Sequence, residues 1–348
     1  MFTFSDDGFF KAPVFAGAFY FFDEFVVLRG LAYISGNSLF TLAMTYRIFA
    51  PLLVILFLVS ACNDSSATLE DLESDIESVL NEEDGTYALF YKDLSNPELQ
   101  ITINPDTMFH AASTMKTPVM IEVFKQAEEG RFSIYDSVRI ENKFYSIVDS
   151  SEFSLELDPE ADDPYESMVG ETATIYDLTH AMITYSSNIA TNLMIDLVGA
   201  ENTTETMREL GADSIRVLRG VYDMKAFERG LSNRTTARDL AIILESIAKG
   251  EVVDAEASQL MLDILQDQFY KDIIAGDLPD EAIVASKSGF ITGVRHDSGI
   301  VYLPDGRSYL LVYLSKNVPD EDRSVAVGAS ISRMIYDFYM NNPVASEQ

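Results

Sequence analysis

The order of strand-like and helix-like segments along the chain limits its fold more than any other feature. Strand patterns occur in two groups, at residues 87–92, 99–104, 282–290, 297–304 and 308–316. Between the groups, residues 113–275 are mainly helical in pattern, with a loop rich in Asp, Pro and Ser at 145–170. Apolar residues at helical spacing predict two further helices, at 69–82 and 321–341.

This order predicts an α+β fold, because strands and helices are segregated along the chain and do not alternate. The strands from both ends would form one antiparallel five-stranded sheet, flanked by the N- and C-terminal helices. We expect one domain over 69–348, with a sheet lobe at 69–112 and 282–348 and an all-helical lobe at 113–281.

The composition excludes one large class of partners. Lys and Arg number 24 against 56 Asp and Glu, which gives a net charge of −32. Such a surface repels phosphate backbones, so we expect no nucleic-acid partner. A hydrophobic content of 47% is that of a globular protein, and we expect a monomer.

The chain has one cysteine, Cys62, and it follows a short apolar segment. Arg47, the apolar residues 48–59 and two small residues precede it, as in a secretory signal. A transmembrane helix is the alternative, but the apolar segment is short for crossing a bilayer. Residues 58–62, Leu-Val-Ser-Ala-Cys, resemble a bacterial lipobox. The resemblance implies cleavage before Cys62 and lipidation of its thiol.

These features divide the N-terminal part of the chain into three segments. We expect residues 44–61 to be a lipoprotein signal peptide and the small polar residues 62–68 to be a tether. Residues 1–43 precede a normal-looking signal peptide and would be a gene-start extension, or else a translated part ahead of an internal anchor. The protein would then lie in the cell envelope, anchored to a membrane and facing the periplasm or the exterior.

Ser113 and Lys116 form the first candidate site. A serine hydroxyl keeps its proton at neutral pH and needs a neighbouring base to act as a nucleophile. Lys116 follows Ser113 by three residues, so on a helix both project from the same face. Pro118 is tolerated only in a first helical turn, which places the helix start near Ser113. Alone, this spacing also fits an N-capping serine beside a solvated lysine.

Two further motifs favour the catalytic interpretation. Ser186-Ser187-Asn188 and Lys287-Ser288-Gly289 follow Ser113-x-x-Lys116 in the order in which Ser-x-x-Lys, Ser-Asp-Asn and Lys-Thr-Gly occur in class A β-lactamases and penicillin-binding proteins. Over residues 69–342 the chain therefore resembles that serine hydrolase superfamily. It departs by having Ser187 in place of Asp and Ser288 in place of Thr.

The resemblance implies a mechanism through an acyl-enzyme on Ser113. Lys116 would accept the serine proton as a neutral amine, since burial and the second cation Lys287 both lower a lysine pKa. Ser186 would protonate the leaving nitrogen, and Asn188 would hold Lys116 and the substrate amide. No metal or other cofactor is implied.

The third motif would bind the substrate. Ser288 would contact its carboxylate, with Lys287 near, and Gly289 would let it approach the strand closely. The backbone N–H groups of Ser113 and Phe290 would form the oxyanion hole. Arg295 is a further candidate for binding a carboxylate.

Two other kinds of hydrolase site are not expected. A triad of Ser113, His296 and Asp297 would require two adjacent strand residues to act together, although they point to opposite faces. A zinc site is improbable with three histidines and one cysteine, the latter predicted to be lipidated.

The sequence leaves the deacylation step open. Class A enzymes carry a glutamate, in a Glu-x-x-x-Asn run, on the loop before a Thr-Thr helix, and residues 219–233 contain no such run. Asp223 and Glu228 are the available acids there, but neither fits the spacing, and we expect both to form surface salt bridges. Three functions follow: a class A-like β-lactamase, a D-alanyl-D-alanine peptidase or other cell-wall peptide hydrolase trapped by β-lactams, and a non-catalytic envelope binding or sensor protein. The corresponding partner is a β-lactam or a peptidoglycan peptide.

Overall fold

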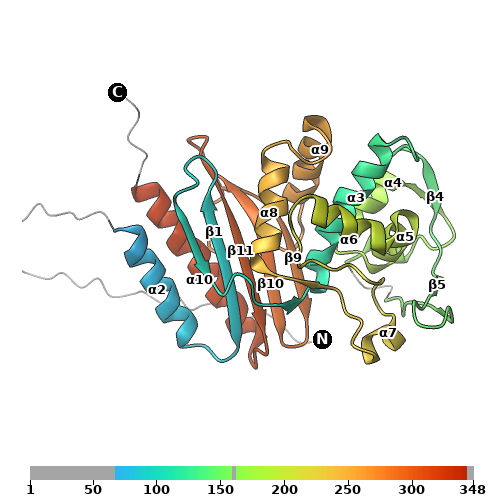
Figure 1. Ribbon diagram of the computed structural model, residues 1–348, viewed down its shortest axis with the longest axis horizontal. Helices are drawn as coiled ribbons and strands as arrows, with labels where there is room; N and C mark the ends of the chain where they lie inside the picture. Colours follow the sequence, from blue (N-terminus) through green and yellow to red (C-terminus); the bar gives the residue numbers. More distant parts are fainter. Residues whose placement is uncertain (1–66, 159–161, 343–348) are drawn as a thin grey trace, which may run out of the picture. The chain divides into compact units, whose positions relative to one another are not determined.

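A five-stranded antiparallel sheet lies at the centre of the computed structural model, which describes residues 67–158 and 162–342 (Figure 1). The strand order is β2-β1-β11-β10-β9, so β9 is an edge strand. The strands are β1 (Thr86–Asp93), β2 (Gln100–Ile103), β9 (Ile283–Ile291), β10 (Val294–Tyr302) and β11 (Ser308–Lys316). The predicted fold class is therefore confirmed.

One strand boundary differs from the prediction. The strand expected to begin at residue 297 begins at Val294, because Thr292-Gly293 forms a tight hairpin turn directly after β9. Gly293 has φ +70°, a left-handed conformation that glycine adopts without strain. The polar residues Arg295 and His296 concealed the start of β10, since their hydrogen-bond partners come from distant segments.

Two terminal helices cover one face of the sheet (Figure 1). They are α2 (Leu69–Asn81) and α10 (Glu321–Asn341), close to the predicted bounds. Thr68 and Asp71 form a capping box at the start of α2. Apolar side chains of both helices pack with the outward-facing tyrosines of β1 and β11 in one hydrophobic cluster.

The opposite face of the sheet belongs to a second, larger cluster, which continues into most of the helices between residues 116 and 266. Alternate residues of β1, such as Ala88 and Phe90, belong to this cluster, while Leu89 and Tyr91 belong to the first. The helices are α3 (Lys116–Glu128), α4 (Ile175–Thr184), α5 (Asn188–Val198), α6 (Ala200–Glu209), α7 (Met224–Glu228), α8 (Ala237–Ala248) and α9 (Ala255–Gln266).

Short elements connect these helices. Two 3-10 turns are η1 (Ala112–Met115) and η2 (Pro164–Glu166). Three two-stranded ribbons pair β3 (Phe109–His110) with β8 (Arg234–Thr235), β4 (Ser137–Arg139) with β7 (Thr172–Thr174), and β5 (Phe144–Tyr145) with β6 (Glu152–Phe153). The predicted loop at 145–170 thus contains β6 and η2.

The caps of α4 and α8 use their acidic residue differently. Thr174 and Asp177 form a complete capping box at the start of α4. At α8 the Thr236 hydroxyl accepts a hydrogen bond from Asp239 N, but the Asp239 carboxylate instead accepts from the backbone of residues 214–215. Asp239 therefore tethers the preceding loop.

The predictions for the N-terminal part concern residues outside the described ones. They are the extension at 1–43, the signal peptide at 44–61, lipidation of Cys62 and most of the tether at 62–68. Within 67–158 and 162–342, no helix is both long enough and apolar enough to cross a bilayer.

Candidate active site

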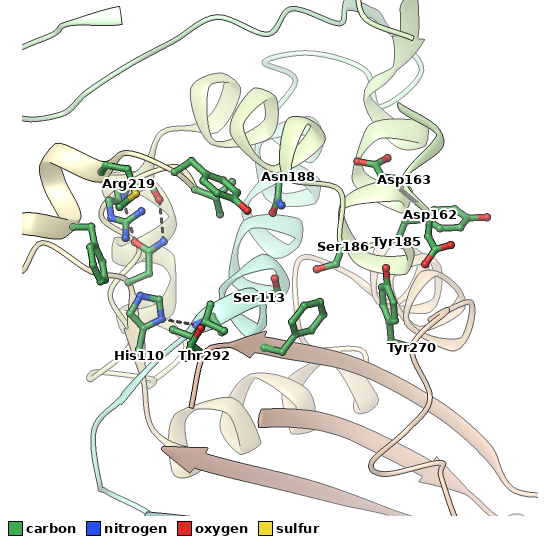
Figure 2. Close-up of a pocket in the computed structure, with 18 of the residues that line it drawn as sticks. His110, Ser113, Asp162, Asp163, Tyr185, Ser186, Asn188, Arg219, Tyr270 and Thr292 are labelled. Carbon is green, nitrogen blue, oxygen red and sulfur yellow. Dashed lines mark hydrogen bonds between the residues drawn. The ribbon is translucent and has the colours of Figure 1, made fainter. Parts of the chain in front are cut away.

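Three segments that are distant in sequence meet beside the edge strand β9. They are η1 with the start of α3, the turn between α4 and α5, and β9 itself. Ser113, Ser186 and Asn188 point toward a common space in Figure 2. With Phe290 they line a cavity of about 520 Å³, large enough for a small-molecule substrate.

Ser113 lies in the 3-10 turn η1, directly before α3. Helix α3 begins at Lys116, slightly later than predicted, and Pro118 lies in its first turn as expected. The preceding residue, Ala112, has φ +46° and donates its N–H to His110 Nδ1 at 3.0 Å. A non-glycine residue with this φ is strained, so the turn that presents Ser113 is held by the surrounding structure.

Lys116 is fully buried and is held by the α4–α5 turn. Its Nζ donates to the Ser186 carbonyl at 2.6 Å, to Ser186 Oγ at 3.0 Å and to Asn188 Oδ1 at 3.3 Å. Burial lowers the pKa of Lys116 well below its usual value, and the charge of Lys287 lowers it further. The carboxylate of Asp163 acts in the opposite direction. A neutral amine is therefore far more accessible at this position than on an exposed lysine.

Lys287 is the second fully buried lysine. Its Nζ donates to the Ser288 carbonyl at 2.9 Å. Burial lowers its pKa to about 7, against the opposing effect of Asp297. Burial in turn raises the pKa of Asp297 to about 6. Burial therefore disfavours the charged form of both Lys287 and Asp297. Ionisable groups whose pKa values are shifted in this way are typical of functional sites.

Ser187 stands where the Ser-Asp-Asn motif has aspartate, and helix capping explains why serine is accepted there. Ser187 is the N-cap of α5, and its hydroxyl accepts a hydrogen bond from Ala190 N at 3.2 Å. Serine and aspartate are both strong N-caps, so serine at this position preserves the cap. The adjacent Ser186 has φ +56°, and this conformation directs its carbonyl and hydroxyl to the same ammonium group.

Gly289 allows β9 to lie very close to the nucleophile. A Cβ atom at this position would be 3.0 Å from the backbone nitrogens of both Ser113 and Thr114. Contacts that short to backbone atoms are rarely tolerated, so a side chain here would push the strand away. The next residue, Phe290, is exposed on this edge strand and lines the cavity.

Other predicted binding residues lie around a second cavity of about 430 Å³, which shares Phe290 with the first. They are Ser288, Gly289 and Arg295. The Ser288 hydroxyl is inaccessible to solvent and has no hydrogen-bond partner among the described residues. Arg295 forms an ion pair with Glu321 and donates to the carbonyl of Val294. Its guanidinium is therefore already engaged by a carboxylate, and its role in substrate binding stays a prediction.

His296 and Asp297 do not form a triad with Ser113. His296 is buried; its Nδ1 accepts from Ser315 N at 3.1 Å, so its Nε2 donates to the His110 carbonyl at 2.9 Å. Burial lowers its pKa to about 4, which keeps the ring neutral. The Asp297 carboxylate accepts from Ile274 N at 3.1 Å. The two side chains thus act separately, as the strand geometry predicts.

The loop at 219–233 forms one wall of the cavity. The side chain of Asn192 holds the loop by two hydrogen bonds to Val221. Its Oδ1 accepts from Val221 N at 2.7 Å, and its Nδ2 donates to the Val221 carbonyl at 3.1 Å. Tyr222, with φ +62°, and Arg219 line the cavity from this wall. No periodicity or motif in the sequence pointed to these three residues.

The interpretation of Asp223 as a surface salt bridge was wrong. Asp223 is buried and binds neutral donors: its Oδ1 accepts from Ser146 Oγ at 2.8 Å and Ala226 N at 3.1 Å, and its Oδ2 accepts from Ile147 N at 3.0 Å. It is the N-cap of α7 and ties this loop to the 145–170 segment. Helix α7 has only five residues, so the sequence shows no helical periodicity after Asp223 from which its role as an N-cap could be recognised.

Sequence reasoning also missed the acids that do line the cavity. Asp162, Asp163 and Glu166 line it from the loop at 145–170. Figure 2 shows Asp162 and Asp163 opposite Arg219. Their only sequence signal was the abundance of acidic residues, which indicated a loop but no function.

Comparisons with known proteins agree with this geometry. The model of a family described as "Beta-lactamase enzyme family" matches residues 71–339. The β-lactamase VEB-1 of Pseudomonas aeruginosa is 21% identical over 306 residues, which cover 83% of this chain and 97% of that protein. The β-lactamase CTX-M-25 of Escherichia coli is 25% identical over 246 residues, covering 69% of this chain and 80% of that protein.

Solved structures share this fold. The structure of PBP-A superimposes with a TM-score of 0.67 at 26% identity, covering 78% of this chain and 96% of PBP-A. A point mutant of PBP-A, determined as an acyl-enzyme complex with penicillin G, matches with the same TM-score and identity and covers 78% of this chain and 97% of its own.

Proposed function

The chain belongs to the β-lactamase enzyme family, and on this premise we propose that it is a serine hydrolase that opens β-lactam amides through an acyl-enzyme on Ser113. One observation carries the proposal. Lys116, a lysine whose pKa is strongly lowered by burial, follows Ser113 by one turn and donates hydrogen bonds to Ser186 and Asn188. This arrangement supplies the base that a serine nucleophile needs.

Acylation would proceed through three proton transfers. Ser113 Oγ attacks the carbonyl carbon of the amide, and its proton passes to the neutral amine of Lys116. The amide C–N bond then breaks, and the leaving nitrogen takes the proton of the Ser186 hydroxyl. The Lys116 ammonium, 3.0 Å from Ser186 Oγ, returns a proton to that hydroxyl. Protons and charge balance without any other participant.

The negative charge that develops on the carbonyl oxygen requires fixed donors. The backbone N–H groups of Ser113 and Phe290 are the proposed pair, and two observations support them. Gly289 brings β9 to within van der Waals distance of the η1 backbone, and β9 is an edge strand, so some of its N–H groups face away from the sheet. Preorganised donors of this kind provide much of the catalysis in acyl transfer.

Deacylation is the step at which two functions separate. Among the described residues, no acid of the 219–233 loop lines the cavity, because Asp223 is buried in other contacts and Glu228 is exposed elsewhere. This observation favours a second candidate, a D-alanyl-D-alanine peptidase or related cell-wall hydrolase that β-lactams trap. The resemblance to PBP-A, of which a mutant forms a penicillin G acyl-enzyme, supports the same alternative.

The proposed location is the cell envelope, with a lipid anchor at Cys62. This part of the proposal rests on the sequence before Cys62 alone. Mass spectrometry of protein extracted from membranes tests it, since a lipidated N-terminal cysteine adds a diacylglycerol-sized mass. A processed chain without that mass would contradict the anchor.

A single experiment separates the candidate functions. The purified protein is mixed with a chromogenic cephalosporin, and turnover and intact mass are followed together. Many turnovers support a β-lactamase, a stoichiometric long-lived adduct supports a peptidase trapped by the drug, and neither result supports a non-catalytic binding protein. The variants Ser113→Ala and Lys116→Ala are the controls, with circular dichroism to verify folding.

Lys116→Ala gives the sharpest prediction for the mechanism. We expect acylation to slow by at least about 100-fold, because a general base is removed from the nucleophile. Normal acylation of this variant, measured as adduct formed per minute, would exclude the lysine as the base.

A further inference from the structure

Two buried lysines lie in this site, and among the residues 67–158 and 162–342 one acid acts on each of them. Lys287 is opposed by Asp297, which comes from the neighbouring strand β10. For Lys116 the corresponding acid is Asp163, which comes from the loop at 145–170. The turn that binds the Lys116 ammonium, residues 185–188, contains no acidic residue of its own.

Asp163 lies at the edge of the cavity, next to this turn. It lines the same cavity as Ser186 and Asn188 (Figure 2). It caps η2, which packs against α5, and its Oδ1 accepts a hydrogen bond from Tyr165 N at 3.0 Å. Its Oδ2 is inaccessible to solvent, and no hydrogen bond of good geometry reaches it from the described residues, although the Ser187 hydroxyl is near enough to favour the ionised carboxylate. A buried carboxylate that is so weakly hydrogen-bonded is costly, so its retention points to an electrostatic role.

The interactions of the carboxylate indicate what that role is. Burial raises the pKa of Asp163, whereas the Ser187 hydroxyl, the Tyr165 N–H and the charge of Lys116 lower it. Lys116 is thus the cation that helps keep Asp163 ionised, and Asp163 is the anion that favours the Lys116 ammonium. Two tyrosines, Tyr165 and Tyr270, also face this carboxylate, but burial raises their pKa values and they stay neutral.

We propose that Asp163 is a positioning residue of the Ser113 site, whose carboxylate balances the charge of Lys116 and orders the turn that carries Ser186. Its catalytic meaning rests on the proposed function, while the charge interaction exists without any substrate. When Lys116 takes the serine proton, it becomes an ammonium group beside Lys287 in a buried site. A fixed carboxylate stabilises that state and makes the amine a stronger base.

The first test measures Lys116 directly and needs no substrate. The protein is labelled with lysine carrying 13C at Cε, and the Lys116 signal is assigned by its absence in Lys116→Ala. In Asp163→Asn we expect the titration midpoint of Lys116 to move to lower pH. Asp162→Asn is the matched control, since it removes the same charge from the neighbouring exposed position, where solvent screens it. Equal midpoints in Asp163→Asn and the control would overturn the proposal.

The second test follows acylation by a penicillin across pH, as intact mass. Asp163→Asn should shift the acid limb of the profile to lower pH and lower the plateau rate by about tenfold, because a weaker base is less effective. A lower plateau with an unmoved limb would indicate a merely structural role and would contradict the proposal. Asp163→Ser is the second variant if Asp163→Asn fails to fold, since serine also caps η2.

The two tests distinguish failure of this inference from failure of the proposed function. If no penicillin acylates the wild-type protein, the proposed function is wrong, but the Lys116 titration still decides the role of Asp163. If acylation is normal and the titration midpoint does not respond to Asp163→Asn, only the inference is wrong.

Discussion

Replacing Lys287 with methionine should flatten the dependence of the protein's stability on pH between pH 7 and 9. Lys287 is fully buried, and its pKa is lowered from 10.5 to about 7. Between these pH values the unfolded chain carries a proton on this lysine that the native protein lacks. The wild-type free energy of unfolding therefore rises as the pH increases from about 7, and the penalty is greatest below pH 7.

The magnitude follows from the two pKa values. At about 1.4 kcal/mol per pKa unit, the buried lysine lowers stability by roughly 4 kcal/mol at pH 7 and by roughly 2 kcal/mol at pH 9. Wild type should therefore gain about 2 kcal/mol from this residue over that interval. Methionine is similar in volume and has no charge, but it leaves Asp297 buried without its cation, a loss of about 3–5 kcal/mol that offsets the gain at pH 7. We therefore expect little net change in stability at pH 7 and the loss of the gain of about 2 kcal/mol between pH 7 and 9.

Urea unfolding at pH 7, 8 and 9, followed by circular dichroism, measures both effects. The matched control is Lys271→Met, which removes the same charge from an exposed position and should keep the wild-type slope. The same Lys287→Met variant should lose acylation, since the charge that helps to keep Lys116 neutral is gone. If wild type and Lys287→Met gain stability equally between pH 7 and 9, the buried lysine does not have the protonation behaviour argued above.

Two further substitutions test the backbone around the site. Gly289→Ala places a Cβ 3.0 Å from the nitrogens of Ser113 and Thr114; displacement of the strand should slow β-lactam acylation by about tenfold with a nearly unchanged melting temperature, and wild-type rates by mass spectrometry would contradict this. Ser187→Ala removes the cap on Ala190 N and should lower the free energy of unfolding by about 1 kcal/mol, whereas Ser187→Thr keeps the hydroxyl and should retain most of it; equal urea midpoints for the two variants would exclude a capping role.

Much of the fold was predictable because its signals are local. The helix at 321–341 was predicted from its apolar spacing, and the structure gives the same bounds. The turn Pro304-Asp305-Gly306 between β10 and β11 and the Thr174 capping box are likewise encoded by neighbouring residues. The start of β10 was mispredicted because Arg295 and His296 find their partners in distant segments.

The candidate site was likewise predictable only in part. The residue types and their spacing predicted that Ser113, Lys116, Ser186 and Lys287 belong to one serine hydrolase site, and the structure brings Lys116 and Ser186 into direct contact. Spacing could not predict that a carboxylate from the 145–170 loop would act on Lys116, because that loop has no periodic pattern and its acids resemble solvated surface residues.

By itself, the sequence determined which reactive groups the chain possesses, the order of its strands and helices, and the local turns and caps that depend on a few adjacent residues. Only the tertiary structure decided that Lys116 and Lys287 are fully buried, that Asp297 and Asp163 are the acids acting on them, and that Glu321 engages Arg295. The reason is physical: desolvation and charge interactions depend on distances through space, and these arise from packing between segments that lie far apart along the chain.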